Sequence, residues 1–162
     1  MADESGRAVC LRRHPFITMS EMISYLAYAS SATRELRADD IADILARSQR
    51  KNAAQDLTGA LLYKGGSFLQ VLEGPQQAVV DTFHRVGMDA RHRGIVVLLR
   101  GVAPEREFGD WSMAYGDADI DGTCCGDYAD FLTRRWAPDR DDAVATACRS
   151  LLWTFKRNLE RA

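Results

Sequence analysis

Long apolar runs are missing from this sequence of 162 residues. No stretch approaches the roughly 20 apolar residues that a membrane-spanning helix requires. The first segment, MADESGRAVCLRRHPFITMSE, has no apolar core of the kind that signal peptides carry. We therefore expect a cytoplasmic protein without a membrane partner, and a flexible arm at residues 1–20 because they are charged and aperiodic.

An excess of one charge is missing as well. The formal net charge is −2, and Arg91-His92-Arg93 is too short a basic block to indicate nucleic-acid binding. The four cysteines include no C-x-x-C pair, and the adjacent Cys124 and Cys125 lack the further His or Cys residues of a metal or redox site. These absences predict reduced thiols, no metal and no nucleic-acid partner.

Catalytic signatures are equally scarce. The sequence has no G-x-S-x-G, H-E-x-x-H or Walker motif and no complete G-x-G-x-x-G motif. The acidic run DADIDG at 117–122 lacks the downstream Glu of an EF-hand loop. Because no nucleophile can be paired with a base, we expect a protein that is not an enzyme.

What the sequence does contain is a regular alternation of strand and helix patterns. Strand patterns cover Met22–Ser30, Leu57–Tyr63, Ser67–Glu73, Gly94–Val102 and Phe108–Gly116, and helix patterns cover Ala38–Asn52 and a segment that begins at Pro75. The predicted fold class is α+β with the order β-α-β-β-α-β-β, a ferredoxin-like sheet with one extra strand and two helices on one face. This domain would occupy residues 21–117.

Two further helices are expected in residues 118–162, which would form a C-terminal extension. Along the second of them, apolar residues recur at helical spacing, namely Val144, Ala147, Cys148, Leu151, Leu152, Phe155 and Leu159. This stripe needs a cover, either the open face of the sheet or another chain. Trp153 lies off the stripe and is a candidate for an interface with another chain.

Gln70 is an unusual residue at the centre of the apolar strand GSFLQVLEG, residues 66–74. A buried amide without partners costs about 1–3 kcal/mol, so something must satisfy it. If Tyr28 and Gln70 both face the helices, as the two-residue period of a strand allows, the hydroxyl and the amide can meet in a cleft. The alternative is a tyrosine of the core and a glutamine that bonds to backbone.

The other candidates also have ordinary alternatives. Asn52, at the end of the first expected helix, either caps that helix or directs its amide at a ligand in the same cleft. Trp111 and Met113 alternate along the last expected strand, where both residue types usually pack in a core. His92 follows the second helix, and a lone histidine is more often structural than a ligand.

In combination, these residues resemble one protein family. The motif N-x4-LTG-x-L-x-Y begins at Asn52, F-x-Q-x-LEG begins at Phe68, and W-S-M begins at Trp111. Together with Tyr28 in the first strand, this series is similar to the BLUF family of flavin-binding blue-light sensors over Met22–Asp117.

The resemblance implies a flavin between the two helices, usually FAD, although FMN and riboflavin would fit the same pocket. It implies flavin-contacting positions at Tyr28, Lys51, Asn52, Phe68, Gln70, Arg91 and His92, and a signal relay at Trp111 and Met113. It further implies that blue light moves an electron from Tyr28 to the flavin and a proton through Gln70. Gln70 is then left rotated or tautomerised, and the flavin absorption shifts to the red.

The resemblance indicates only in outline how the sensor passes its signal on. The residues after Asp117 are too few for a fused cyclase or phosphodiesterase, which implies a short stand-alone sensor. Its C-terminal helices would pack on the sheet face opposite the flavin helices and signal to a separate downstream protein, and a dimer is the expected assembly.

Two competing interpretations remain. The first is a small ferredoxin-like hydrolase of the acylphosphatase type, but YASSATRE offers only Arg34 and hydroxyl groups to cradle a phosphate. The second is a BLUF-like interaction domain that has lost its flavin. Intact Tyr28, Asn52 and Gln70 argue against that loss.

Overall fold

The computed structural model describes residues 22–109 and 112–117 and, near the C-terminus, residues 147–148, 150–152, 154–155 and 157. Within these ranges the helices and strands follow the predicted order. They are β1 (Ile23–Ala32), α1 (Ala38–Ala54), β2 (Thr58–Lys64), β3 (Ser67–Gly74), α2 (Gln76–Gly87), β4 (His92–Ala103) and β5 (Ala114–Asp117). The arm predicted for residues 1–20 and most of the predicted C-terminal extension lie outside the described residues.

The sheet has the strand order β4-β1-β3-β2-β5. β1 pairs with β3 and β4, and β2 pairs with β3, all in antiparallel fashion, while β5 adds a parallel edge strand beside β2. The predicted α+β class is confirmed as a four-stranded antiparallel sheet, β2-β3-β1-β4, with two helices. Its central strands β1 and β3 bring Tyr28 directly opposite Gln70.

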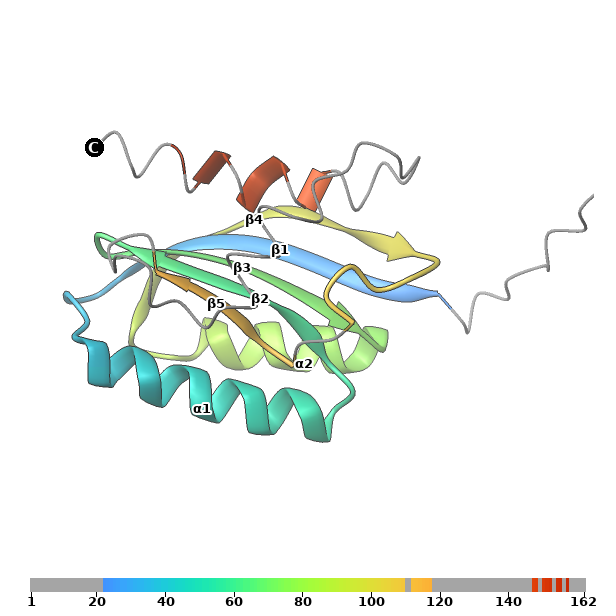
Figure 1. Ribbon diagram of the computed structural model, residues 1–162, viewed down its shortest axis with the longest axis horizontal. Helices are drawn as coiled ribbons and strands as arrows, with labels where there is room; N and C mark the ends of the chain where they lie inside the picture. The colour runs from blue at the N-terminus through green and yellow to red at the C-terminus, as the bar shows by residue number, and fades with distance from the viewer. Residues whose placement is uncertain are drawn as a thin grey trace, which may run out of the picture.

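α1 and α2 lie on the same side of the sheet (Figure 1). α1 has acidic residues in its first turn and Lys51 in its last, charges that suit the helix dipole. Its buried face carries Ile41 and Ile44, and α2 contributes Val79. These side chains pack on alternate strand residues in a first core cluster, which includes Leu26, Tyr28, Leu61, Phe68 and Leu72.

The opposite face of the sheet carries a second core cluster. It contains the strand residues that point away from α1 and α2, together with Phe108, Cys148 and Leu152. Leu151 and Phe155 pack against it, and Figure 1 shows the described helical residues near the C-terminus on this side of the sheet. Cys148 is buried there as a small apolar residue, which agrees with its position in the predicted stripe.

Most element boundaries differ from the prediction by only one or two residues, and the last strand differs most. The last strand begins at Ala114 and not at Phe108. Phe108 lies in the loop before this strand. Its backbone N–H donates to the Glu73 carboxylate at 2.9 Å and not to the backbone of a neighbouring strand, and its ring is buried in the second cluster. α2 begins at Gln76, because Pro75 keeps an extended backbone, with ψ of 134°, at the N-cap.

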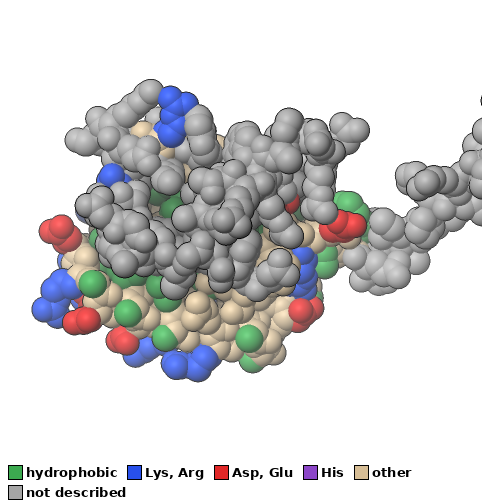
Figure 2. All heavy atoms as spheres, in the orientation of Figure 1, with side chains coloured by type: hydrophobic (Ala, Val, Ile, Leu, Met, Phe, Trp, Pro, Cys, Tyr) green, Lys and Arg blue, Asp and Glu red, His purple; other side chains and the backbone are tan. Residues whose placement is uncertain are grey.

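The visible face of the helix layer mixes acidic and basic side chains without a large area of one sign (Figure 2). Large exposed apolar side chains are found mainly on the edge strand β4, at Val96, Val97, Leu98 and Val102. Among the helices that the structure describes, none is long and apolar enough to cross a membrane.

Candidate functional site

Tyr28 and Gln70 form the centre of the candidate site. Tyr28 is fully buried and Gln70 is 6% exposed, and the strand period turns both towards the helix layer. The Tyr28 hydroxyl donates a hydrogen bond to Gln70 Oε1. The amide oxygen is therefore satisfied by a tyrosine side chain and not by backbone, which decides between the two alternatives that the sequence left open.

The other end of the Gln70 amide faces Met113. Gln70 Nε2 lies 3.5 Å from Met113 Sδ, and Met113 is buried just before β5. A thioether sulfur is a weak acceptor, so this end of the amide is held less firmly than the end bonded to Tyr28. The contacts form a continuous set from β1 through β3 to the segment before β5, which we call the Tyr28–Gln70–Met113 network.

Asn52 connects α1 to the same segment. The residue is 2% exposed, and its Nδ2 donates to the backbone oxygen of Ser112 at 2.7 Å. One turn earlier, Gln49 Nε2 donates to the backbone oxygen of Met113 at 3.3 Å. The left-handed conformation after the helix belongs to Asp56, whose φ is 53°. Asn52 is thus not the left-handed cap that one interpretation of the sequence allowed; its side chain holds the segment at Ser112.

Aromatic rings surround the Tyr28 end of the network. The Phe68 ring lies 4.4 Å from the His92 ring and the Phe83 ring lies 5.4 Å from the Tyr28 ring, measured between centroids. His92 Nδ1 lies 2.8 Å from the Ser30 hydroxyl oxygen, which fixes the orientation of the imidazole. Of the predicted site residues, His92 has its ring 6.5 Å from the Tyr28 ring, and Phe68 shares the first core cluster with Tyr28. Trp111, predicted to act with Met113, falls outside the described residues.

Burial sets the protonation state of the two titratable rings. It raises the pKa of Tyr28, with a smaller contribution from the negative charge of Asp89, so the hydroxyl keeps its proton at neutral pH. It lowers the pKa of His92, although the charge of Asp89 opposes this, so the imidazole is neutral there. The Tyr28 hydroxyl is therefore a donor within an uncharged network.

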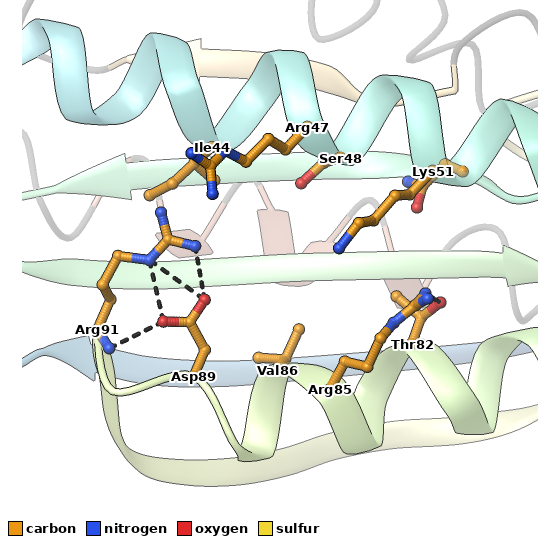
Figure 3. A pocket seen from close by; sticks show the side chains of 10 residues that line it. Ile44, Arg47, Ser48, Lys51, Thr82, Arg85, Val86, Asp89 and Arg91 are labelled. Atoms are coloured by element: carbon orange, nitrogen blue, oxygen red, sulfur yellow. Dashed lines mark hydrogen bonds and ion pairs between the residues drawn. The ribbon is translucent and has the colours of Figure 1, made fainter.

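A cavity of about 240 Å³ opens between α1 and α2 (Figure 3). It is lined by one face of α1, by α2 and by the turn before β4, with side chains from Ile44, Arg47, Ser48, Lys51, Asn52, Thr82, Arg85, Val86, Asp89 and Arg91. The predicted site residues thus fall into two groups. Lys51, Asn52 and Arg91 line the cavity, and the remaining described ones lie in or beside the buried network. Asn52 belongs to the cavity and contacts the segment that carries Met113.

Arg91 is held at the cavity wall by Asp89. The guanidinium Nη2 lies 2.6 Å from Asp89 Oδ2, and the Arg91 backbone N–H donates to Asp89 Oδ1 at 3.0 Å. These bonds hold the pKa of Asp89 at about 2, so the carboxylate is charged at neutral pH and balances the charge of Arg91.

Glu73 is a structural residue that the sequence analysis did not single out. It is buried at the end of β3, and its carboxylate accepts the backbone N–H groups of Glu107 and Phe108 at 3.1 and 2.9 Å and faces the Thr58 hydroxyl at 3.4 Å. These bonds attach the loop between β4 and β5 to the strand that carries Gln70. The only signal for it was a charged residue in an otherwise apolar strand.

Glu73 should make the stability of the domain depend on pH. Burial raises its pKa in the folded state above the ordinary value of 4.5, although the Phe108 and Glu107 N–H groups oppose this. The stability that Glu73 contributes is therefore fully present below pH 4.5 and is lost as pH rises through the folded-state pKa. Relative to Glu73→Gln, wild type should lose about 1.4 kcal/mol of unfolding free energy for each pH unit by which burial raises that pKa. Urea unfolding of both proteins across this pH range measures the difference, and a constant difference would contradict the assignment.

Residues 23–114 match the family model BLUF, described as sensors of blue-light using FAD. The chain belongs to the BLUF family. BLUF proteins are blue-light photoreceptors that use a flavin in signal transduction, so the resemblance seen in the sequence is confirmed.

Proteins similar to this BLUF chain include both long and short photoreceptors. The chain is 36% identical over 92 residues to photoactivated adenylate cyclase subunit beta of Euglena gracilis, and the match covers 56% of this chain but 11% of the cyclase. It is 35% identical over 96 residues to the blue light- and temperature-regulated antirepressor BluF of Escherichia coli K12, which covers 59% and 24% of the two chains. The dark-state structure of BlrB, a BLUF protein, has a TM-score of 0.61 at 26% identity and covers 83% of this chain and 98% of BlrB. The chain thus spans only a minor part of the two curated relatives and nearly all of BlrB.

The residues around the cavity fit the flavin of a BLUF protein. Asn52 Oδ1 is buried at the cavity, and no described residue donates to it, while Gln70 Nε2 has only a weak sulfur acceptor. Buried amides normally have full partners, and the polar edge of a flavin ring offers both an N–H donor and carbonyl acceptors. The cavity volume is close to the lower end of the range for small-molecule sites, roughly 300–1,000 Å³.

Proposed function

We propose that the light-sensitive element of this BLUF photoreceptor is the Tyr28–Gln70–Met113 network. The observation that supports it is the hydrogen bond from the Tyr28 hydroxyl to Gln70 Oε1, with the opposite end of the same amide on Met113. A primary amide has a donor end and an acceptor end that a half-turn of the side chain exchanges. It can therefore have two hydrogen-bonding arrangements in one buried place.

In this proposal Asn52, Lys51 and Arg91 hold the flavin at the cavity, and Phe68 and His92 close the pocket behind the network. When bound, the flavin supplies blue-light absorption and, once excited, takes an electron from a nearby aromatic side chain. Tyr28 is the electron donor in this proposal. Loss of an electron makes its buried hydroxyl strongly acidic, so the hydroxyl then gives up its proton. The proton passes to Gln70 Oε1, the acceptor that the hydroxyl already contacts.

Return of the electron and the proton leaves the Gln70 side chain turned or tautomerised and uncharged. The Gln70 donor then faces Tyr28 and no longer contacts Met113 Sδ. A changed hydrogen bond in a dry pocket has a larger effect than one in water. A flavin held at the cavity would then have a changed hydrogen-bonding environment without any covalent change, and its absorption would shift to the red.

The signal would leave the pocket through Met113. Asn52 and Gln49 fix the backbone at Ser112 and Met113, immediately before β5, so loss of the Met113 contact loosens an edge strand of the sheet. We infer that the ferredoxin-like domain at 21–117 transmits this change to helices at 118–162, which pack on the open sheet face. The membership of Leu152 in the second cluster supports that arrangement.

The partner would be a separate signalling protein. One relative is named as a light-regulated antirepressor, which is a function exercised on another protein, and it supports an output of this type. A dimer remains the expected assembly.

A spectroscopic experiment tests the proposed function. Purified protein is loaded with FAD, and absorption is recorded in the dark, under blue light and during dark recovery. The expected result is a small red shift that reverses in the dark. A protein that binds FAD but whose spectrum does not change under blue light would contradict the mechanism, and a protein that binds no flavin would contradict the cofactor assignment.

A further inference from the structure

The outer side of β4 is a sheet edge that carries exposed apolar side chains. β4 ends the strand order of the sheet, and no strand that the structure describes pairs with its outer side (Figure 1). Of the six large apolar side chains that are exposed in the described part of the chain, four lie on this strand, namely Val96, Val97, Leu98 and Val102. An edge strand presents backbone N–H and C=O groups to solvent, so this one is a template for a further strand.

The middle of this edge lacks the charges that usually prevent strand pairing. Native edge strands are commonly short or carry charged residues or proline, whereas β4 has 12 residues and its segment 94–99, GIVVLL, contains neither. Leu98 also has no partner on β1, since Leu99 pairs with Ala27 and Val97 pairs with Tyr28. It is therefore the extra residue of a β-bulge, which leaves its side chain 40% exposed and enlarges the apolar surface.

Arginines flank the apolar segment at both ends. Arg93 and Arg100 are exposed, and neither forms an ion pair with an Asp or Glu in the described ranges. Arg93 pairs with Ser31 and Arg100 with Leu26, which lie on opposite faces of β1 by the two-residue period. The edge therefore has one unpaired cation at each end, one on either face of the sheet.

These charges decide between a second copy of this chain and a different partner. Antiparallel pairing of two copies about Val97 would place Arg93 of one copy opposite Gly101 of the other and next to its Arg100. The joined edge would then carry two arginines at each end and no carboxylate, because β4 contains no Asp or Glu. Like charges in proximity are unfavourable, whereas a strand with a carboxylate at each end would balance both arginines.

We propose that the outer edge of β4 binds an extended segment of the partner protein as an additional strand of the sheet. The segment has apolar residues in its middle and Asp or Glu at both ends, about seven positions apart to match Arg93 and Arg100. Backbone hydrogen bonds supply the affinity, and the two carboxylates fix the register. This inference rests on the proposed function only for the existence of a partner. Because Val97 pairs with Tyr28, β4 alone would separate the docked segment from the strand that carries Tyr28.

Titration of the FAD-loaded full chain with two synthetic peptides tests the proposal, with two-dimensional NMR of the backbone amides as the readout. The probe is ETVTVTVE and the comparison peptide is KTVTVTVK, both blocked at their ends. ETVTVTVE should shift the amide signals of β4 and leave those of α1 in place. At low salt it should bind about tenfold more tightly than KTVTVTVK, because two exposed ion pairs take the place of two repulsive contacts.

Two variants test whether the arginines cause this preference. Arg93→Gln/Arg100→Gln should bring the affinity ratio of the two peptides close to one. Arg50→Gln is the matched control, because Arg50 is exposed on α1, away from β4, and it should leave the ratio unchanged.

The possible failures are distinct from a failure of the proposed function. The docking site would be overturned if ETVTVTVE does not bind, if its shifts fall outside β4 and its neighbour β1, or if both peptides bind the wild type equally. If Leu98→Lys turns a dimer of the wild type into a monomer, the edge pairs two copies of this chain and the proposal is also wrong, since an edge lysine opposes strand pairing. None of these results alters the red shift under blue light, on which the proposed function depends.

Discussion

Replacing Gln70 with leucine should leave flavin bound and abolish the red shift under blue light. Asn52, Lys51 and Arg91 line the cavity and are unchanged by this substitution, so they remain to hold the cofactor. Leucine has similar size but neither a donor nor an acceptor. It cannot take the Tyr28 proton or exchange hydrogen-bonding ends, and both arrangements of the network are lost.

The effect on stability should be moderate. Leucine removes a buried amide but leaves the Tyr28 hydroxyl without its acceptor, and such a group costs about 1–3 kcal/mol. The control is Gln76→Leu, which makes the same chemical change at an exposed position in the first turn of α2. Light-minus-dark absorption spectra of the two variants, each loaded with FAD, measure the outcome. A normal red shift in Gln70→Leu would rule out the amide as the switch.

Replacing Gly59 with alanine should have the largest effect on folding. Gly59 lies in β2 beside β3, and its φ of 158° is tolerated mainly by glycine. An added Cβ would lie 2.0 Å from the backbone oxygen of Val71, a distance that no side-chain rotation can relieve. Because the clash is with the backbone of the central strand, β2 and β3 would have to separate.

We expect Gly59→Ala to lose more than about 4 kcal/mol of unfolding free energy, a loss found only for severe packing or backbone faults. Gly87→Ala is the matched control, because a Cβ at this helical position meets no atom within 4 Å. It should change stability by less than about 1 kcal/mol and in the favourable direction, since alanine is a better helix former. Urea unfolding measures both changes. Equal stability of Gly59→Ala and wild type would show that β2 and β3 do not approach as described.

The fold was largely predictable because local patterns and long-range packing agree. The two-residue period of β1 and β3 places Tyr28 and Gln70 on the face that the helices cover. The exception is the segment before β5, where the apolar and aromatic residues follow a strand pattern. There Phe108 is tied by its N–H to Glu73, 35 residues away in the sequence, and no local pattern encodes such a bond.

The candidate site was predictable in its residue types but not in its connections. A buried glutamine indicated a partner, and the sequence left open whether that partner was Tyr28 or backbone. The contacts of Gln70 with Met113 and of Asn52 with Ser112 join segments 43 and 60 residues apart. These contacts form because β5, and the segment before it, lie beside β2. That placement becomes known only when the strand order of the sheet is known.

The central claim is that light breaks the contact between Gln70 and Met113, and the methyl group of Met113 reports on it directly. Methionine methyl groups labelled with carbon-13 give separate signals in two-dimensional NMR, and Met113→Leu identifies the one that matters. Met88 is 75% exposed at the end of α2 and serves as an internal control. In the FAD-loaded protein, blue light should move the Met113 signal and leave the Met88 signal in place. In Gln70→Leu, blue light should move neither signal. A Met113 signal that stays unchanged while the flavin absorption shifts to the red would contradict the account.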